Sequence, residues 1–450
     1  MTQQGVRWTA DQVLALAPDP SSRKAGSRLG GAGPWSDAGC SGEGAVWGLC
    51  KGSGSRPYQT VVDIADVTGP AYKCSCPSRK FPCKHALGLL LLWAGGDGAV
   101  PEGPAPDWAD EWVTGRRKRS EEKKTPAAAP AAGADPEAAR RRAEKRAERV
   151  TAGATELEQR LTDLLRGGLA TAERAGYGLW EETAARMVDA QAPGLAARVR
   201  ELGAIPGSGP GWPMRLLEEC ALLHLLDEGW LRRDALPGGL AAAVRSRIGL
   251  PASADGPPLR DRWLVLAQYD TADGHLTTRR IWLYGVESGR TALLLSFGAA
   301  GRAPALALPV GVALDAELAA YPGTGQLRAD LREQFAAPEP SAARPPGTST
   351  EGAAARYGEA LRDDPWLDTW PVTLARVVPT PVEDTWQLAE ADGSTALPLA
   401  PSALVSPGLW RLVALSGGAP VTVFGECGHR GFRPLTAWAD EESAEAVTLT

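Results

Sequence analysis

Three cysteines and one histidine lie within the twelve-residue segment Cys74-Ser-Cys-Pro-Ser-Arg-Lys-Phe-Pro-Cys-Lys-His85. The whole chain of 450 residues has only seven cysteines and four histidines, which argues against four unrelated reduced side chains as the alternative. Three thiolates and one imidazole are the ligand set of a closed tetrahedral zinc site. Because such a site leaves no position open for water or substrate, the pattern predicts a structural zinc ion held by Cys74, Cys76, Cys83 and His85.

The spacing of these ligands predicts how the backbone presents them. Side chains two residues apart in an extended strand point to the same side, so Cys74 and Cys76 can bind one ion from the end of a strand. On a helix, residues two apart would point about 200° apart. We therefore expect Cys83 just before a helix and His85 in its first turn, with the apolar residues 86–93 burying that helix.

The pattern C-x-C-x(n)-C-x-H resembles the SWIM zinc finger, with no ligand missing. A Pro-Cys-Lys-His run before an apolar helix and a hairpin-like stretch upstream, at 45–50 and 58–64, are typical of that family. The whole chain is similar to actinobacterial SWIM finger proteins in its Ala/Arg/Gly-rich composition and in the run Met187-Val-Asp-Ala-Gln-Ala-Pro-Gly194. The resemblance implies Zn²⁺ as the cofactor, a role in DNA binding or protein interaction, and no catalysis. Bacterial relatives resemble accessory factors encoded near AAA-type ATPases, which favours an adaptor with a protein partner in such a system.

The predicted finger is locally basic, with six basic and two acidic residues between positions 51 and 90. Arg79, Lys80 and Lys84 lie between or beside the ligands, so we expect their side chains to point away from the zinc site. They could contact phosphates or an acidic partner. Alternatively, they offset the negative charge of a site that combines three thiolates with one Zn²⁺.

A basic low-complexity stretch follows the finger. Residues 115–150 contain twelve basic and six acidic residues, and the first half is too poor in large apolar side chains to pack. The second half, from Pro136, is rich in strong helix formers and predicts a solvated helix that leads into the next domain. Such a stretch could contact nucleic acid or simply connect two domains. The whole chain has a net charge of −6, and its acidic remainder favours protein partners, so nucleic-acid binding by the finger and linker is the alternative function.

The hydrophobic pattern predicts an α+β multidomain protein: a small zinc-bound β-hairpin/helix module, a helical bundle and a C-terminal β-rich part. Leucines recur at helical spacing after residue 155, and Asp-Gly and Ser-Gly turns then separate apolar strands. In the C-terminal part we expect strands at 370–378, 385–389, 409–415 and 420–425. The predicted domains are a SWIM-type zinc finger domain at 1–114, the basic linker at 115–150, a helical domain at 151–255, a β-meander domain at 256–335 and a C-terminal β-rich domain at 336–450.

The remaining cysteines and histidines give weaker signals. Cys50 ends a predicted strand and is expected in the core, whereas the sequence leaves open whether Cys40 is a further ligand. Cys220 and His224 are spaced to bind one metal from a helix, but the leucines around them favour a buried core position for both.

The sequence contains no Walker A motif, Gly-x-Ser-x-Gly elbow or His-Glu-x-x-His motif, so we expect no enzymatic activity. The N-terminus has no apolar core, and the longest apolar run, 86–94, is too short to span a bilayer. We therefore expect a cytoplasmic protein that does not contact the membrane and whose thiols stay reduced.

Overall fold

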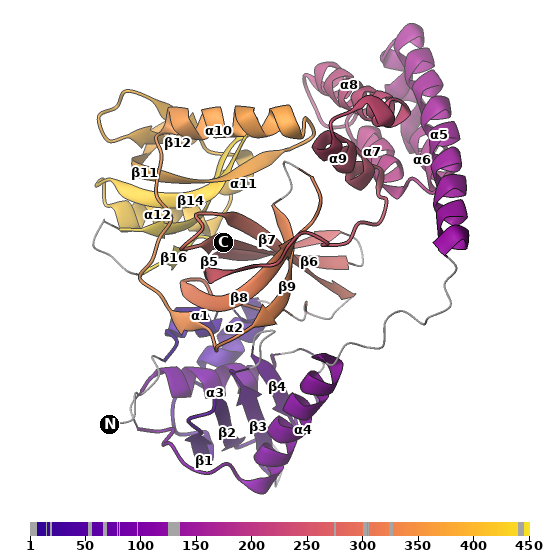
Figure 1. Cartoon of the computed structure of the whole chain (residues 1–450). Helices are drawn as coiled ribbons and strands as arrows, with labels where there is room; N and C mark the ends of the chain where they lie inside the picture. Colours follow the sequence, from indigo (N-terminus) through magenta and orange to yellow (C-terminus); the bar gives the residue numbers. More distant parts are fainter. Residues whose placement is uncertain are drawn as a thin grey trace.

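The computed structural model describes the chain as four units, with a β-barrel between an N-terminal module, a helical bundle and a C-terminal sheet (Figure 1). This arrangement confirms the predicted α+β multidomain class. The description covers all residues except 1–6, 15, 19, 53–55, 66–69, 79, 81, 97, 125–135, 274–275, 300–303, 305, 324–326 and 440–444.

The N-terminal module is built on a four-stranded antiparallel sheet in the order β1-β2-β3-β4. The predicted hairpin forms its central pair, and one further strand lies on each side. The strands are β1 (Trp35–Cys40), β2 (Ala45–Cys50), β3 (Tyr58–Asp63) and β4 (Ala71–Cys74). The helices are α1 (Ala10–Leu14), α2 (Pro20–Ser27), α3 (Lys84–Ala94) and α4 (Asp107–Lys124).

Helix α3 is the central helix of this module. It packs against α1, α2 and one face of the sheet, and its leucines at 87, 89 and 90 are fully buried. At Gly88 a Cβ atom would lie 2.5 Å from Cβ of Leu29, so only glycine allows this close approach. Helix α4 covers the opposite face, where Val113 packs with Trp47 and Val61.

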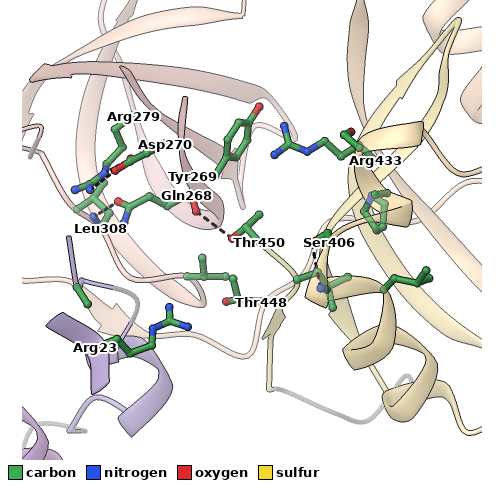
Figure 2. A pocket seen from close by; sticks show the side chains of 18 residues that line it. Arg23, Gln268, Tyr269, Asp270, Arg279, Leu308, Ser406, Arg433, Thr448 and Thr450 are labelled. Atoms are coloured by element: carbon green, nitrogen blue, oxygen red, sulfur yellow. Dashed lines mark hydrogen bonds and ion pairs between the residues drawn. The ribbon is translucent and has the colours of Figure 1, made fainter. Parts of the chain in front are cut away.

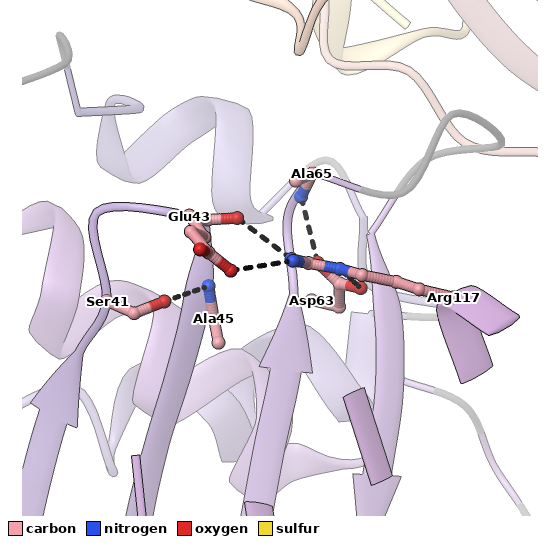
Figure 3. Close-up of polar contacts among 6 residues, drawn as sticks. All are labelled: Ser41, Glu43, Ala45, Asp63, Ala65 and Arg117. Atoms are coloured by element: carbon pink, nitrogen blue, oxygen red, sulfur yellow. Dashed lines mark hydrogen bonds and ion pairs between the residues drawn. The ribbon is translucent and has the colours of Figure 1, made fainter. Parts of the chain in front are cut away.

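The segment predicted as a basic linker, 115–150, is largely helical where it is described. Helix α4 continues to Lys124, and α5 begins at Pro136. Arg117 on α4 reaches the sheet, where its Nη2 and Nε lie 2.9 and 3.2 Å from the carboxylate oxygens of buried Asp63 (Figure 3). Arg117 also donates to the backbone oxygen of Glu43 at 2.8 Å. Residues 115–124 therefore belong to the N-terminal module rather than to a free basic arm.

The predicted helical bundle contains five α-helices among residues 136–248. In the first turn of α7, a Cβ atom on Gly194 would collide with the carbonyl group of Arg247, so glycine lets α7 pack against the end of α9. The bundle also contacts the C-terminal unit, because Arg247 pairs with Asp364 at 2.8 Å and Trp366 Nε1 donates to Leu222 O at 2.8 Å. The helices are α5 (Pro136–Gly167), α6 (Ala170–Asp189), α7 (Pro193–Ala204), α8 (Trp212–Leu231) and α9 (Gly238–Ile248).

The predicted three-stranded meander is present, and two further strands close it into a barrel. Each neighbouring pair is antiparallel except β7 and β9, which are parallel, and β8 pairs with both β5 and β9. Around the barrel the strands follow one another as β5, β6, β7, β9 and β8, with β7 and β9 parallel. This is the strand order of an OB-fold barrel. The strands are β5 (Leu259–Asp273), β6 (Leu276–Gly285), β7 (Thr291–Ala299), β8 (Val312–Ala320) and β9 (Arg328–Gln334), with β10 (Glu339–Pro340) at the edge of β8.

The C-terminal unit is an antiparallel sheet in the order β13-β12-β11-β14-β15-β16. One face is covered by helices and the other packs on the barrel, where Phe424 and Trp438 contact Leu264 and Trp282. The strands are β11 (Thr369–Val382), β12 (Thr385–Glu390), β13 (Ala396–Pro398), β14 (Val421–Gly428), β15 (Gly431–Trp438) and β16 (Val447–Thr448). The helices are α10 (Thr350–Asp363), α11 (Pro401–Leu404) and α12 (Pro407–Ser416).

The strand predicted at 409–415 is wrong, because these residues form α12. The Ser406 hydroxyl accepts a hydrogen bond from Gly408 N at 3.1 Å, Pro407 begins the helix, and Gly417 ends it with a positive φ. Leu409 and Leu412 face the core three residues apart, which is helical spacing. These end signals outweigh the β-propensity of the leucine- and valine-rich run.

No helix within the described ranges is both long enough and apolar enough to cross a membrane.

Candidate metal centre

The four predicted ligands come together at one corner of the N-terminal module. The ligand atoms of Cys74, Cys76, Cys83 and His85 all lie within 4.8 Å of one another. Cys74 is the last residue of β4, and Cys83 directly precedes α3 with an extended backbone at φ −75° and ψ 167°. His85 lies in the first turn of α3, as the spacing predicts.

The measured distances fit zinc. Nδ1 of His85 lies 3.7 Å from Sγ of Cys74 and 4.0 Å from Sγ of Cys83. With Zn–S bonds of about 2.3 Å and Zn–N bonds of about 2.0 Å, the edges of a tetrahedral site measure roughly 3.6–3.8 Å. Nδ1 is therefore the imidazole atom placed to bind the ion.

A second set of contacts orients the ligands. The Thr60 hydroxyl, on β3 opposite Cys74, lies 3.3 Å from the sulfur of that cysteine. Beyond the end of β4, Ser75 N donates to Gln59 O at 3.0 Å and its hydroxyl accepts from Gln59 N at 3.0 Å, which continues the strand pairing past the first ligand. Outer contacts of this kind fix ligand orientation and tune metal affinity. The role of Thr60 depends on the register between β3 and β4, which the sequence alone does not predict.

The electrostatics of the cluster favour one thiolate before any metal is bound. The pKa of Cys74 lies well below its usual range, and the hydrogen bond from the Cys83 thiol is the largest cause, with smaller contributions from His85 and Thr60. The pKa of Cys83 is raised because its thiol donates that hydrogen bond, and burial raises the pKa of Cys76. A zinc ion takes all three sulfurs as thiolates, so binding releases protons.

The site is enclosed on the side of the helix. Cys83 and His85 are buried, and the Tyr58 ring lies 4.9 Å from the imidazole, centroid to centroid. Cys74 and Cys76 are half-buried at the rim. With four protein ligands, a bound ion cross-links β4, the loop and α3 and keeps no position for a substrate.

The predicted basic contact residues remain a prediction. Lys80 and Lys84 are both exposed. Lys80 Nζ lies 3.4 Å from the Ser21 hydroxyl on α2. Arg79 lies outside the described residues.

The other cysteines are separate from the site. Cys50 is fully buried, as expected, and Cys40 is not a further ligand, because it is buried with Sγ 3.6 Å from Val100 O. Cys220 is buried in the bundle as predicted. The buried position expected for His224 is wrong, because its side chain is 56% exposed and its Nδ1 lies 2.6 Å from Glu158 Oε1.

A cavity of about 350 Å³ lies where α2, the barrel and the C-terminal unit meet (Figure 2). Two of the arginines that line it are already paired. Arg279 Nε lies 2.7 Å from Asp270 Oδ1, and Arg433 Nη1 lies 3.6 Å from Glu426 Oε2. Because these charges are matched within the protein, the cavity resembles a polar junction between units more than a ligand site.

These observations define a protein with a structural Cys3His zinc centre on a sheet-and-helix module. Residues 66–94 match the family model of the SWIM zinc finger, and residues 145–248 match that of the SWIM-associated four-helix bundle domain. The chain thus contains a zinc-binding SWIM finger, which holds all four ligands, and the bundle associated with it, whose match ends with α9. No curated protein and no solved structure matches the chain.

Proposed function

We propose that this protein is a non-catalytic adaptor in which zinc stabilises the N-terminal module and a surface of the C-terminal unit binds a partner protein. The observation that carries this proposal is a pair of surface tryptophans, Trp386 and Trp410, here called the Trp410 patch. Trp410 on α12 is 64% exposed, and Val405, between α11 and α12, is 85% exposed. The Trp386 ring on β12 meets the Trp410 ring edge to face at 5.9 Å.

An exposed tryptophan in a rigid frame suits protein recognition. Tryptophan is enriched among the residues that dominate binding energy at protein interfaces, and contiguous exposed apolar surface marks interaction sites. The helix that carries Trp410 is held by its Ser406 cap and by Leu409 and Leu412 in the core. The patch therefore offers a preformed surface whose binding requires little ordering of the backbone.

The rim of the patch indicates the chemistry of the partner. Glu383 and Asp384 form the turn between β11 and β12, one residue before Trp386, and both are exposed. An acidic turn beside apolar side chains complements a segment that carries apolar and basic residues. We therefore commit to a basic, apolar protein segment as the occupant.

The test begins with a full-length protein that carries a photo-crosslinking amino acid at position 405. This protein is crosslinked in an extract of the source organism, and the captured protein is then purified. The informative step is titration of that purified partner against variants. Trp410→Ala should weaken binding at least tenfold. Met214→Ala, which truncates an equally exposed side chain on α8, should leave affinity within about twofold. Equal affinities of the Trp410→Ala variant and the unaltered protein would refute the proposed surface.

A second candidate function, nucleic-acid binding by the finger, is supported by the exposure of Lys80 and Lys84 beside the ligands. If these lysines contact phosphates, the affinity for DNA should fall steeply with salt. Replacing both with glutamine should then lower the slope of log affinity against log salt by roughly 2 for duplex DNA. A slope unchanged by the double replacement would count against this function.

A further inference from the structure

We propose that the barrel binds single-stranded nucleic acid on the uncovered end of its β5-β6-β7 face. This site is separate from the zinc centre and from the Trp410 patch. The inference begins with topology, because in barrels of this strand order the face of the second and third strands is the ligand-binding face. Here those strands are β6 and β7.

The C-terminal sheet covers only part of this face. Glu426 on β14 is buried and accepts hydrogen bonds from Tyr269 Oη at 2.7 Å and from Trp282 Nε1 at 3.0 Å. Phe424 packs beside it against Trp282. Beyond Trp282, towards the turn between β5 and β6, residues of the same face are half-buried or exposed.

Strand register arranges the residues at this end of the face in two rows. One row runs across Tyr269, which is buried at the border of the strip, then Arg280 and Leu295, and the next row runs across Thr278 and Phe297. Residues two apart in a strand share a face, so both rows point the same way as Trp282. Phe297, near the end of β7, is 52% exposed.

The charge on this strip is available to a ligand. Arg280 Nε is buried without a hydrogen-bond partner, and within the described ranges no carboxylate pairs with its guanidinium, which lies 5.8 Å from the Trp282 ring centre. Arg433, which pairs with Glu426 at 3.6 Å, stacks at 4.2 Å over Tyr269 at the border of the strip (Figure 2). Unlike Arg280, Arg279 on the other face of β6 is paired with a carboxylate, that of Asp270.

An exposed aromatic ring beside an unpaired arginine is the combination that binds single strands. Each base can stack on the ring, and the guanidinium can meet a backbone phosphate. In a duplex the base faces are already stacked, so Phe297 would select unpaired bases. Thr271 and Thr278, which lie opposite each other on β5 and β6, add hydroxyl groups rather than the continuous apolar surface that a protein partner would need.

The test measures fluorescence anisotropy of a labelled oligothymidylate of about 12 nucleotides titrated with the full-length, zinc-loaded protein. Phe297→Ala should weaken binding about tenfold, whereas Phe297→Trp should retain it because the stacking surface remains. Arg280→Gln should weaken binding and reduce the slope of log affinity against log salt by roughly 0.7, the value for one phosphate contact on a single strand.

Controls separate this site from the others. Trp410→Ala, which disables only the proposed protein surface, should bind the oligonucleotide normally, so the two proposals can fail independently. Replacing Lys80 and Lys84 with glutamine should likewise leave binding unchanged. The barrel site is overturned if the unaltered protein does not bind or if Phe297→Ala binds as well as the unaltered protein. It is also overturned if only the lysine replacements weaken binding, or if the variant with both lysines replaced binds duplex DNA as tightly as the single strand.

Discussion

Replacement of Asp227 should make the helical bundle more stable and less sensitive to pH. Asp227 lies on α8 in the bundle core with none of its surface exposed, and neither carboxylate oxygen has a hydrogen-bond partner. Burial, together with the nearby charges of Glu158 and Glu228, raises its pKa from 3.8 to about 9. The side chain is therefore protonated in the folded bundle at neutral pH.

The sign of the effect follows from the direction of this shift. Below about pH 4 the carboxyl group is protonated in both the folded and the unfolded chain, so it carries no penalty from ionisation. Between about pH 4 and 9 only the unfolded chain ionises, which lowers the free energy of unfolding by about 1.4 kcal/mol per pH unit. At pH 7, roughly three units above the unfolded pKa, the loss is on the order of 4 kcal/mol.

The assay is hydrogen exchange by mass spectrometry on peptides from α8 in the full-length protein, corrected for intrinsic exchange rates. Between pH 5.5 and 8.5 the opening free energy of the unaltered protein should fall by several kcal/mol relative to Asp227→Asn. Glu218→Gln, a neutralisation on the exposed side of α8, should keep the pH slope of the unaltered protein. If Asp227→Asn showed that same slope, the buried carboxyl group would not be the source of the pH dependence.

Three further predictions concern the N-terminal module. Elemental analysis of the purified protein should find one zinc ion per chain. Cys74→Ser should lose this ion, whereas Cys220→Ser should keep it. Zinc retained in Cys74→Ser would contradict the site. Thr60→Val should lower zinc affinity about 10- to 100-fold in a chelator competition, because the hydroxyl beside the first ligand is lost, and an unchanged affinity would remove Thr60 from the site. Arg117→Met should destabilise the module by about 3–5 kcal/mol, because it leaves Asp63 charged and buried, and adding Asp63→Asn should restore part of that loss in the same exchange assay.

The metal centre could be predicted because its ligands are close in sequence. Cys74 and Cys76 follow one strand end, and Cys83 and His85 bracket the start of one helix, so local backbone geometry is enough to bring them together. Thr60 could not be found in this way, because its position beside Cys74 depends on strand pairing. His224 was misjudged because its leucine neighbours indicate that part of α8 is buried, but not which side of the helix faces solvent.

In the C-terminal unit the error at α12 has a physical cause within the sequence itself. Leu409, Leu412 and their apolar neighbours fit a short strand by composition, and only the capping residues Ser406 and Gly417 distinguish the helix. Trp410 is exposed because α12 is a helix. A strand predicted at these residues therefore does not predict the proposed interaction surface.

The barrel shows which information a linear pattern lacks. The turns between β5, β6 and β7 are local and predict a meander, whereas closure requires β8 to pair with β5 across about fifty residues and β9 to lie parallel to β7. The charged sequence of β9, Arg-Ala-Asp-Leu-Arg-Glu-Gln, contains few of the apolar residues that mark a strand. The covering of the barrel face is more remote still, because Glu426 meets Tyr269 from 157 positions away. The C-terminal sheet ends on the barrel before it reaches Phe297 and Arg280. The position of this edge therefore decides which part of the face a ligand can reach.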